Sequence, residues 1–422
     1  MVSVATSSGQ AGAPAERRPD LPALTGMRII AALLVFLCHA VLPVTSGNHN
    51  PPMPYGDQGL TMNLLWFFSA GGQISLSFFF LLSGFIITWS TRPGDRVLAY
   101  WRRRVVKIFP NHAVTWALAM VLFAGAYTPY WGLPNLFLVN SFSPDPALWG
   151  GANMPAWSLG PEMFFYLLFP LLIIPIRKIA ENRLWLWAVV TVAAMAALCL
   201  ITVYVIPDSP TYPGEPQSLP QFWFSYMFPP ARLVEFVLGM IVARLVISGR
   251  WPRIGVVPVV LFMMVGYAAA LVAPAPFNQT LVSAVPFAVA IGSLAMTNIG
   301  GTRTVFGSRP MVWLGNISFA FYLTQSFILF YLLPKLFGQA GYGVVGGTAL
   351  ILGMVAANIV AGWALHTLVE RPAMRWWSGS RRTRAPRGEV REAPPAPAPA
   401  PAPVPAGSAS SASSASSASS ID

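Results

Sequence analysis

The chain has 422 residues, of which 55% are hydrophobic and 9% are charged. A soluble domain carries roughly a quarter charged residues, so this composition indicates a protein that is surrounded by lipid. The formal net charge of +12 would suit a nucleic-acid-binding protein, but the positive residues are spread along the chain between long apolar runs. This distribution argues against a nucleic-acid surface and indicates membrane topology.

The two ends of the chain differ in composition from its apolar middle. Residues 1–20 are polar and rich in Ala, Ser and Pro, and they predict a disordered segment. Residues 378–422 are first basic, then Ala/Pro-rich and finally Ser/Ala-rich, a composition that cannot form a packed core. Residues 21–377 are therefore predicted to be one membrane domain. Because no small-residue cleavage site clearly follows its first apolar run, we expect that run to be retained as a helix.

The apolar runs predict an all-α, multi-pass bundle of about ten transmembrane helices in the cell membrane. The predicted spans are 28–46, 61–90, 112–130, 162–176, 184–206, 222–246, 254–273, 279–298, 311–333 and 344–368. With both termini in the cytoplasm, every lysine and arginine except Arg232 and Lys335 falls on the inner side. Such asymmetry is typical of an even number of spans.

The first span opens with RIIAALLVFLCHAVLP, in which ten residues separate Arg28 from His39. On a helix these residues rise roughly 16 Å, about half the hydrocarbon thickness. We therefore expect Arg28 at one membrane face and His39 near the middle of the bilayer. An ionisable side chain at that depth is costly, which makes His39 a functional candidate. The alternative is a histidine that a neighbouring helix satisfies.

A basic segment, YWRRRVVKIFPNH at 100–112, precedes the third predicted span. Its four cations within six residues are Arg102, Arg103, Arg104 and Lys107. They are either a topology signal with lipid headgroup contacts or a cradle for a polyphosphate, because guanidinium groups bind phosphate in a bidentate way. We expect Pro110 in the first turn of the span that follows.

Acidic residues are rare in the apolar runs. Glu162 opens the fourth span, where it either caps the helix N-terminus or faces a polar cavity together with His39. Arg232 and Glu235 are three residues apart in the sixth span and predict a helical ion pair, buried in the bundle or lining a wet cavity. Glu370, at the inner end of the tenth span, is expected to pair with an arginine.

Other polar and small residues predict contacts between helices. In the ninth span Ser318, Tyr322 and Gln325 recur at helical spacing, and they either hydrogen-bond neighbouring helices or line a substrate cavity. Small residues in the second span permit close helix contact: Gly71, Gly72, Ser83 and Gly84. Cys38 and Cys199 lie in apolar runs, so we expect small core residues and neither a disulfide nor a metal site.

Two further stretches are predicted to lie outside the bilayer. Residues 207–220 contain five prolines and no apolar periodicity, so they predict an external connection. Trp131 and Trp157 belong to a second external stretch, rich in Trp, Pro and Asn, and are expected to anchor the chain at the membrane interface.

Taken in order, these motifs resemble the acyltransferase-3 family of integral-membrane O-acyltransferases, which includes sugar and lipopolysaccharide O-acetylases and macrolide O-acyltransferases. The resemblance covers roughly residues 20–377. It depends on the Arg28 and His39 pair, FFFLLSGFIIT at 78–88, RRRVVKIFP at 102–110, WSLGPEMFFYLLFP at 157–170, RLVEFVLGM at 232–240 and VERP at 369–372. Each motif is weak alone, whereas the ordered set is specific.

The resemblance implies transfer of an acyl group, commonly acetyl, from acyl-CoA to a hydroxyl of a macrolide-like or glycosylated natural product or of a glycan. Acyl-CoA is then a co-substrate, and no cofactor is permanently bound. The implied catalytic residues are His39 as general base, Glu162 and Arg28; the implied CoA-binding residues are Arg103, Arg104 and Lys107; and the implied substrate-cavity residues are Arg232, Glu235, Tyr322 and Gln325. Imidazole suits the base because its pKa is near neutrality.

The sequence departs from the family pattern at several positions. Gln325 stands where the family often has histidine, and its amide cannot act as a base. Lys107 stands where arginine is common, which keeps the charge but loses the planar fork. Thr25 and Ile29 replace an acid and a glycine near Arg28, so any role of that acid is lost.

Two other classes of protein compete with an enzyme. A transporter or flippase could use His39 and the Arg232/Glu235 pair along a translocation route, although no evident internal repeat supports it. A catalytically inactive scaffold is disfavoured because Arg28, His39 and Glu162 are all present. No soluble hydrolase-like domain is expected after the last span, which favours a stand-alone acyltransferase.

Overall fold

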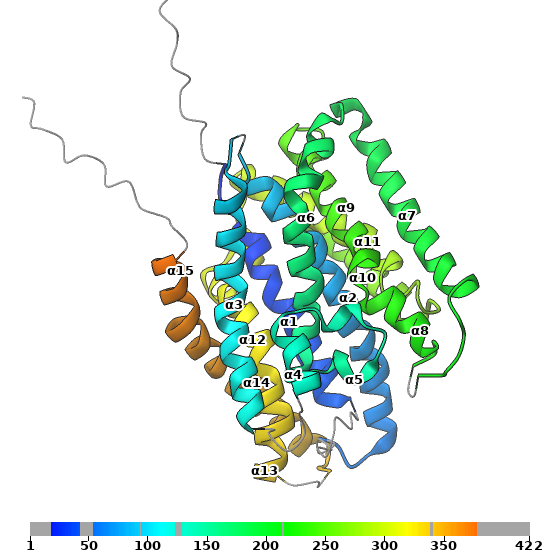
Figure 1. The fold of residues 1–422 in the computed structure, drawn as a ribbon, viewed down its shortest axis with the longest axis vertical. Coiled ribbons are helices and arrows are strands. Elements are labelled where there is room, and N and C mark those ends of the chain that lie inside the picture. Colours follow the sequence, from blue (N-terminus) through cyan, green and yellow to red (C-terminus); the bar gives the residue numbers. More distant parts are fainter. Residues whose placement is uncertain are drawn as a thin grey trace, which may run out of the picture. The chain divides into compact units, whose positions relative to one another are not determined.

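The computed structural model describes residues 18–42, 54–92, 94–122, 129–212, 215–337 and 341–377. Over these ranges the chain forms helices and two isolated β-bridges, Tyr55 with Tyr342 and Thr211 with Ser218. The all-α class predicted from the sequence is confirmed (Figure 1). Residues 1–17 and 378–422 lie outside the described residues, so disorder at the two ends stays a prediction.

The α-helices, in chain order, are α1 (Pro22–Val41), α2 (Gln58–Ser90), α3 (Val97–Leu122), α4 (Pro129–Leu136), α5 (Pro146–Trp149), α6 (Leu159–Lys178), α7 (Leu184–Tyr204), α8 (Leu219–Phe222), α9 (Pro229–Ile247), α10 (Val256–Val272), α11 (Leu281–Ile299), α12 (Arg309–Ser326), α13 (Leu333–Phe337), α14 (Val344–Leu365) and α15 (Arg371–Trp377). Short 3₁₀ helices are η1 (Asn140–Phe142), η2 (Met154–Ser158), η3 (Glu181–Arg183) and η5 (Val305–Gly307). Single π-helical turns are η4 (Trp223–Met227), η6 (Phe327–Leu332) and η7 (His366–Glu370).

Eight helical stretches of the described chain are long and apolar enough to cross a membrane. They are Pro22–Val41, Gln58–Ser90, Val97–Leu122, Met154–Lys178, Glu181–Tyr204, Leu281–Ile299, Arg309–Phe337 and Val344–Trp377. The predicted spans 222–246 and 254–273 are helical but fall outside this set. The first is divided among α8, η4 and α9, of which α9 carries three charged residues, and the second is the 17-residue α10. The protein is a multi-pass membrane protein, while the count of ten and the side of the termini stay predictions.

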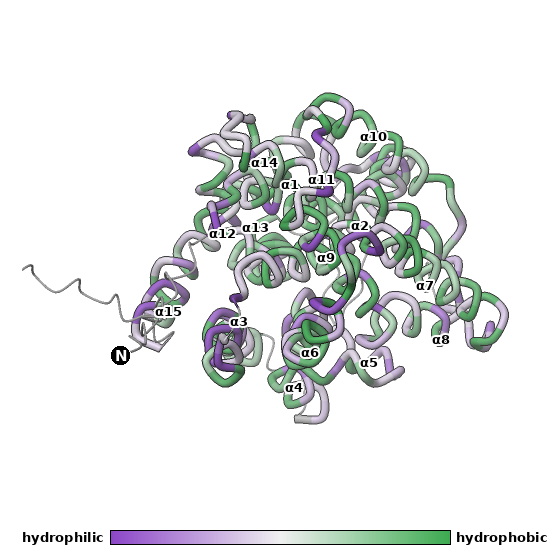
Figure 2. Tube along the Cα trace, turned by 90° about the horizontal axis from the view of Figure 1, so that it is seen from above, coloured by the Kyte–Doolittle hydropathy of each residue, from purple (hydrophilic) through white to green (hydrophobic). Residues whose placement is uncertain are grey.

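Helix α2 packs against both α1 and α9, and each of the three helices also packs against several others of the bundle (Figure 2). Their contacts are close because small residues face a neighbouring backbone. A Cβ built on Gly84 of α2 would lie 2.0 Å from the Phe236 carbonyl oxygen, and one on Gly239 of α9 would lie 1.9 Å from that of Leu81. Without a hydrophobic force between helices in lipid, such close packing is a main source of their association.

The structure corrects two boundaries predicted from hydropathy. Helix α3 begins at Val97, well before the predicted start at 112, so the basic segment and Pro110 lie inside the helix. Arginine and lysine are good helix formers, so the helix continues after the apolar run ends. Helix α1 begins six residues before Arg28, and His39 lies in its last turn rather than midway along it.

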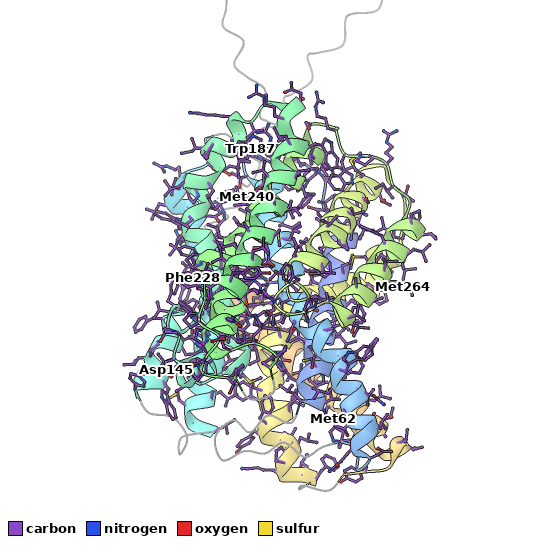
Figure 3. The ribbon with its side chains drawn as sticks, turned by 90° about the vertical axis from the view of Figure 1, so that its right-hand side faces the viewer. Met62, Asp145, Trp187, Phe228, Met240 and Met264 are labelled. Atoms are coloured by element: carbon purple, nitrogen blue, oxygen red, sulfur yellow. The ribbon has the colours of Figure 1, made fainter. Side chains whose placement is uncertain are left out.

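The two ends of the bundle differ in charge. Figure 3 labels Trp187 near one end and Met62 with Asp145 toward the other. Arg177 and Lys178 close α6 just before the short connection to α7. Arg244, in the last turn of α9, lies at the same end because its guanidinium donates to the backbone oxygens of Ile176 and Ile179. We call these the Trp187 end and the Met62 end.

Candidate functional site

His39 is held by one neighbouring side chain. Its Nδ1 lies 3.1 Å from Oε1 of Gln325 on α12, and Nε2 of Gln325 donates to the backbone oxygen of Tyr322 at 2.8 Å. The second bond fixes the orientation of the amide, because the NH₂ group must face the carbonyl. Oε1 then faces the imidazole. Because this oxygen can only accept a hydrogen bond, Nδ1 of His39 must carry the proton, and the lone pair of the neutral ring is left on Nε2.

His39 lines a cavity with a volume of about 590 Å³. We call it the His39 cavity. Its walls come from α1, α2, α4, α5, η2, α8, η4, α12 and η6, together with Gly150, Gly151, Ala152, Tyr212 and Glu215. The lining side chains include Cys38, Gln73, Trp131, Trp149, Trp157, Tyr212, Glu215, Phe222, Tyr226 and Tyr322. Trp157 is therefore a buried cavity residue and not the interfacial anchor that the sequence predicts.

A second, smaller pocket of about 60 Å³ contains Arg28 and Glu162, and we call it the Arg28 pocket. Tyr322 and Leu76 line both this pocket and the His39 cavity, so these two side chains form the partition between them. The Tyr322 hydroxyl is fixed by Ser158 at 2.8 Å and by the Pro155 carbonyl at 2.9 Å. Arg28 and His39 both lie on α1 but line two adjoining cavities, the Arg28 pocket and the His39 cavity.

Glu162 lines the same pocket as Arg28 and does not line the His39 cavity. It lines the Arg28 pocket, where the Tyr166 hydroxyl donates to its Oε1 and Ser83 lies 3.5 Å from the same atom. Tyr166 in turn lies under Arg104 of α3, whose guanidinium carbon is 5.8 Å from the ring centroid. Arg104 is therefore linked to Glu162 of the Arg28 pocket through Tyr166.

The cations of α3 have different surroundings. Arg104 contacts the rings of Tyr100 and Tyr166, and its Nε is buried without a hydrogen-bond partner among the described residues. Arg103 is half-buried. Lys107 instead donates to Oε1 of Glu370, so its charge is already paired within the protein.

Glu370 is at the centre of a buried polar cluster. Its carboxylate accepts from Lys107 and from Nδ2 of Asn111 at 2.8 Å, and it lies 3.2 Å from Nδ1 of His366. The predicted arginine partner is wrong, because the ion pair is formed with Lys107. This cluster joins η7 to α3.

Arg232 and Glu235 form the ion pair that their spacing predicts. Nε of Arg232 lies 3.1 Å from Oε2 of Glu235, and both side chains are 1% exposed. Ser77 of α2 completes the group, since it accepts from Arg232 at 3.0 Å and donates to Glu235 at 2.8 Å. Neither charged residue lines the His39 cavity or the Arg28 pocket. Both lie between α2 and α9 instead.

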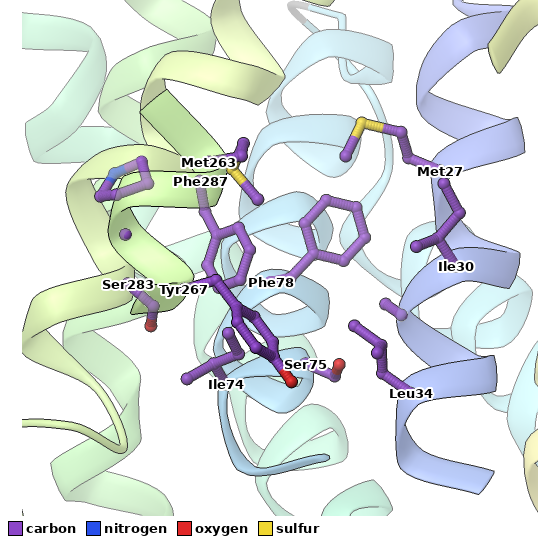
Figure 4. Close-up of a pocket in the computed structure, with 13 residues that line it drawn as sticks. Met27, Ile30, Leu34, Ile74, Ser75, Phe78, Met263, Tyr267, Ser283 and Phe287 are labelled. Atoms are coloured by element: carbon purple, nitrogen blue, oxygen red, sulfur yellow. The ribbon is translucent and has the colours of Figure 1, made fainter. Parts of the chain in front are cut away.

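A third pocket, of about 70 Å³, is almost entirely apolar (Figure 4). Phe78, Phe287 and Met263 surround it, and its hydroxyl groups are already used. Tyr267 donates to the Phe67 carbonyl at 2.6 Å, and the Ser75 hydroxyl donates to the Gly71 carbonyl at the same distance. We therefore assign no chemistry to this pocket.

Sequence reasoning missed Glu215, which lines the His39 cavity from the connection between α7 and α8. Burial raises the pKa of its carboxyl from the ordinary value of 4.5 to about 7. The proline-rich composition around it predicts a connection and gives no sign of an acid facing inward. The sequence carries no signal that distinguishes Glu215 from Asp208, the other acid of the same connection.

The helices and the cavity define a polytopic helical membrane protein with a histidine-lined cavity. The chain belongs to the acyltransferase-3 family, since the model of that family, described as an acyltransferase domain, matches residues 21–367.

Three relatives illustrate this membership. Acyltransferase MdmB of Streptomyces mycarofaciens is 39% identical over 367 residues, which cover 84% of this chain and 92% of the relative. Exopolysaccharide production protein ExoZ of Rhizobium meliloti is 25% identical over 72% of this chain and 90% of its own length. Peptidoglycan O-acetyltransferase OatA of Listeria monocytogenes is 22% identical over 72% of this chain and 49% of its own length. No solved structure matches the chain.

Proposed function

We propose that this chain is an acyl-CoA-dependent O-acyltransferase that moves an acetyl or other short acyl group to a hydroxyl of a macrolide-like or glycosylated natural product or of a glycan. The observation that carries the proposal is His39, whose Nδ1 is held by Gln325 while its ring lines a cavity of about 590 Å³. Family membership and relatives named as an acyltransferase and an O-acetyltransferase support acyl transfer to oxygen.

In the proposed reaction, Nε2 of His39 takes the proton of the acceptor hydroxyl as its oxygen attacks the thioester carbonyl. The carbon–sulfur bond then breaks, and the imidazolium returns the proton to the departing CoA thiolate. Gln325 supports this role because it keeps the proton of the neutral ring on Nδ1. Water is kept from the thioester by the largely aromatic wall of the cavity.

The distribution of charge favours opposite entry routes for the two substrates. Acyl-CoA is a polyanion. Arg28 lines the Arg28 pocket, and Arg104 contacts Tyr166, whose hydroxyl donates to Glu162 of that pocket. In contrast, neither arginine nor lysine is among the described residues that line the His39 cavity. We propose that the Trp187 end faces the cytoplasm and that the thioester reaches His39 past Tyr322 and Leu76.

Donor binding can be tested without knowledge of the acceptor. A ligand that prefers the folded state raises the apparent melting temperature, so acetyl-CoA should stabilise the full chain purified in detergent. The Arg103→Ala/Arg104→Ala variant should lose this shift, and His39→Gln should keep it. A folded protein that no acyl-CoA stabilises would contradict the proposed donor.

A further inference from the structure

One side of the His39 cavity is a continuous group of aromatic rings. The centroids of Trp149 and Tyr212 are 5.9 Å apart, those of Tyr212 and Phe222 are 5.0 Å apart, and those of Phe222 and Tyr226 are 5.2 Å apart. Trp157 extends the group at 5.3 Å from Tyr226. We call these five residues the aromatic wall, and all of them line the cavity.

Glu215 lies in the same cavity and next to this wall. Among the described residues that line the cavity, it is the one carboxylate, and no arginine or lysine accompanies it. The structure gives its carboxylate no hydrogen bond or ion pair within the described chain, whereas the buried Glu235 and Glu370 each have several partners. Glu215 is half-buried, and a carboxylate that is partly removed from water without a partner favours a ligand that supplies one.

We propose that Glu215 and the aromatic wall bind a protonated amine of the acceptor, so that the acceptor carries a basic nitrogen as well as the hydroxyl that is acylated. This inference depends on the proposed function, because it assigns the acceptor to the His39 cavity. Aromatic faces attract cations through their quadrupole, and a carboxylate adds Coulombic attraction to the positive charge. Acyl-CoA does not fit this position, since its phosphates are anionic.

The faces of the wall are not equally free. The guanidinium of Arg232 is 5.1 Å from the ring centroid of Tyr226, so one face of that ring already contacts a cation. Trp149, Tyr212 and Phe222 have no cation near them among the described residues and supply the faces for the amine. Tyr212 is three residues from Glu215, whose backbone N–H donates to the Tyr212 carbonyl at 3.1 Å.

The pH dependence of binding follows from the groups that face Glu215. These titratable groups are Tyr212 on the same connection, Tyr226 on η4, and Cys38 and His39 on α1. Among them Glu215 alone changes from neutral to anionic near pH 7. A ligand of fixed positive charge should therefore bind more tightly as the pH rises from 6 to 8.

The test uses two probes that differ by one atom and one charge: choline and its neutral isostere 3,3-dimethylbutan-1-ol. Their dissociation constants are measured on the full chain in detergent by saturation-transfer NMR. We expect the wild-type protein to bind choline at least about tenfold more tightly at pH 8, which corresponds to about 1.4 kcal/mol. Glu215→Gln should remove this preference and its pH dependence, and Tyr212→Leu should reduce it.

Asp208→Asn is the matched control, since Asp208 is an exposed carboxylate of the same connection. It should leave the preference unchanged. Equal binding of the two probes by the wild type, or a preference that survives Glu215→Gln, would overturn the inference. Acetyl-CoA stabilisation is measured on the same samples. If it persists while the probes fail, this inference alone is wrong, whereas its absence contradicts the proposed donor.

Discussion

In the proposed reaction, the buried amide of Gln325 positions His39 as the base. Its NH₂ group is committed to the Tyr322 carbonyl, which leaves the oxygen for Nδ1 of His39. A free imidazole would divide its proton between two nitrogens. We therefore propose that Gln325, which stands where the family often has histidine, acts as a positioning residue and not as a second base.

Gln325→Leu should lower kcat by about fivefold to tenfold, since the lost hydrogen bond is worth about 1 kcal/mol. The KM for acyl-CoA should not change. Thr324→Val is the control, because Thr324 donates to Asn358 at 2.8 Å on another face of α12. This variant should lose similar stability and keep kcat. Equal effects of the two variants on kcat would contradict the positioning role.

Glu215 should also affect how stability depends on pH. Its pKa is raised by burial from the ordinary 4.5 to about 7. Between these values the unfolded chain is ionised while the folded chain holds a proton, so stability falls as the pH rises through this window and is level above it. Glu215→Gln should remove this slope. Its melting temperature relative to the wild type should rise from pH 5 to pH 7, and a constant difference would contradict the prediction.

For single residues, the sequence was informative where a polar side chain lies within an apolar helix, because burying such a side chain in the membrane is costly. The spacing of Arg28 and His39 along an apolar helix identified two residues that line adjoining cavities. The three-residue spacing of Arg232 and Glu235 correctly predicted a pair. Glu215 was missed because a proline-rich connection gives no periodicity from which to infer that a side chain faces inward.

The close contact between helices α2 and α9 depends on Gly84 of α2 and Gly239 of α9. The small residues of the second span, which include Gly84, predict such a contact. A methyl group on Gly84 would lie 2.0 Å from the Phe236 oxygen. The helices would have to separate, which also disturbs the Arg232 and Ser77 contact between them.

Gly84→Ala should therefore lower the free energy of unfolding by about 1–3 kcal/mol, the usual range for an overpacked core. Gly353→Ala is the control, because Gly353 is exposed on α14 with no atom within 4 Å of a built Cβ. This variant should be neutral or more stable by up to about 1 kcal/mol. Detergent thermal melts measure both, and equal melting temperatures would contradict close α2–α9 packing.

The ion pair between Lys107 of α3 and Glu370 of η7 offers a structural role for Lys107 beside the predicted role in CoA binding. As a partner of Glu370 it is structural, whereas the resemblance to the family places it on CoA. Lys107→Ala should cost about 3 kcal/mol by leaving a buried carboxylate without its cation, and Lys107→Met/Glu370→Gln should recover most of the loss. Recovery of the melting temperature without recovery of acetyl-CoA binding would assign Lys107 both roles. A stable Lys107→Ala protein would contradict the structural role.

Element boundaries were less predictable than element existence. Hydropathy marks where a helix meets lipid, and α3 continues through Arg102 to Arg104 because backbone hydrogen bonds do not require apolar side chains. The π-helical turns η4, η6 and η7 were not predicted. They depend on local insertions in the hydrogen-bond ladder that no residue period reveals.

In the whole molecule, the two adjoining cavities explain how a charged donor and a hydroxyl acceptor could meet inside a membrane protein. Arg104 of α3 is linked to Glu162 of the Arg28 pocket through Tyr166, and the His39 cavity has no lysine or arginine among its described lining residues. Tyr322 and Leu76 lie between them. The proposed chemistry takes place at this partition.

The most direct test of the central claim is the rate of labelled ester formation at saturating [¹⁴C]acetyl-CoA. Full-length wild type and His39→Gln are compared on a panel of hydroxylated macrolides and glycan fragments. The account predicts ester formation by the wild type, at least about 100-fold slower formation by His39→Gln, and equal acetyl-CoA binding by both. An unchanged rate in His39→Gln would contradict the proposal that His39 is the base.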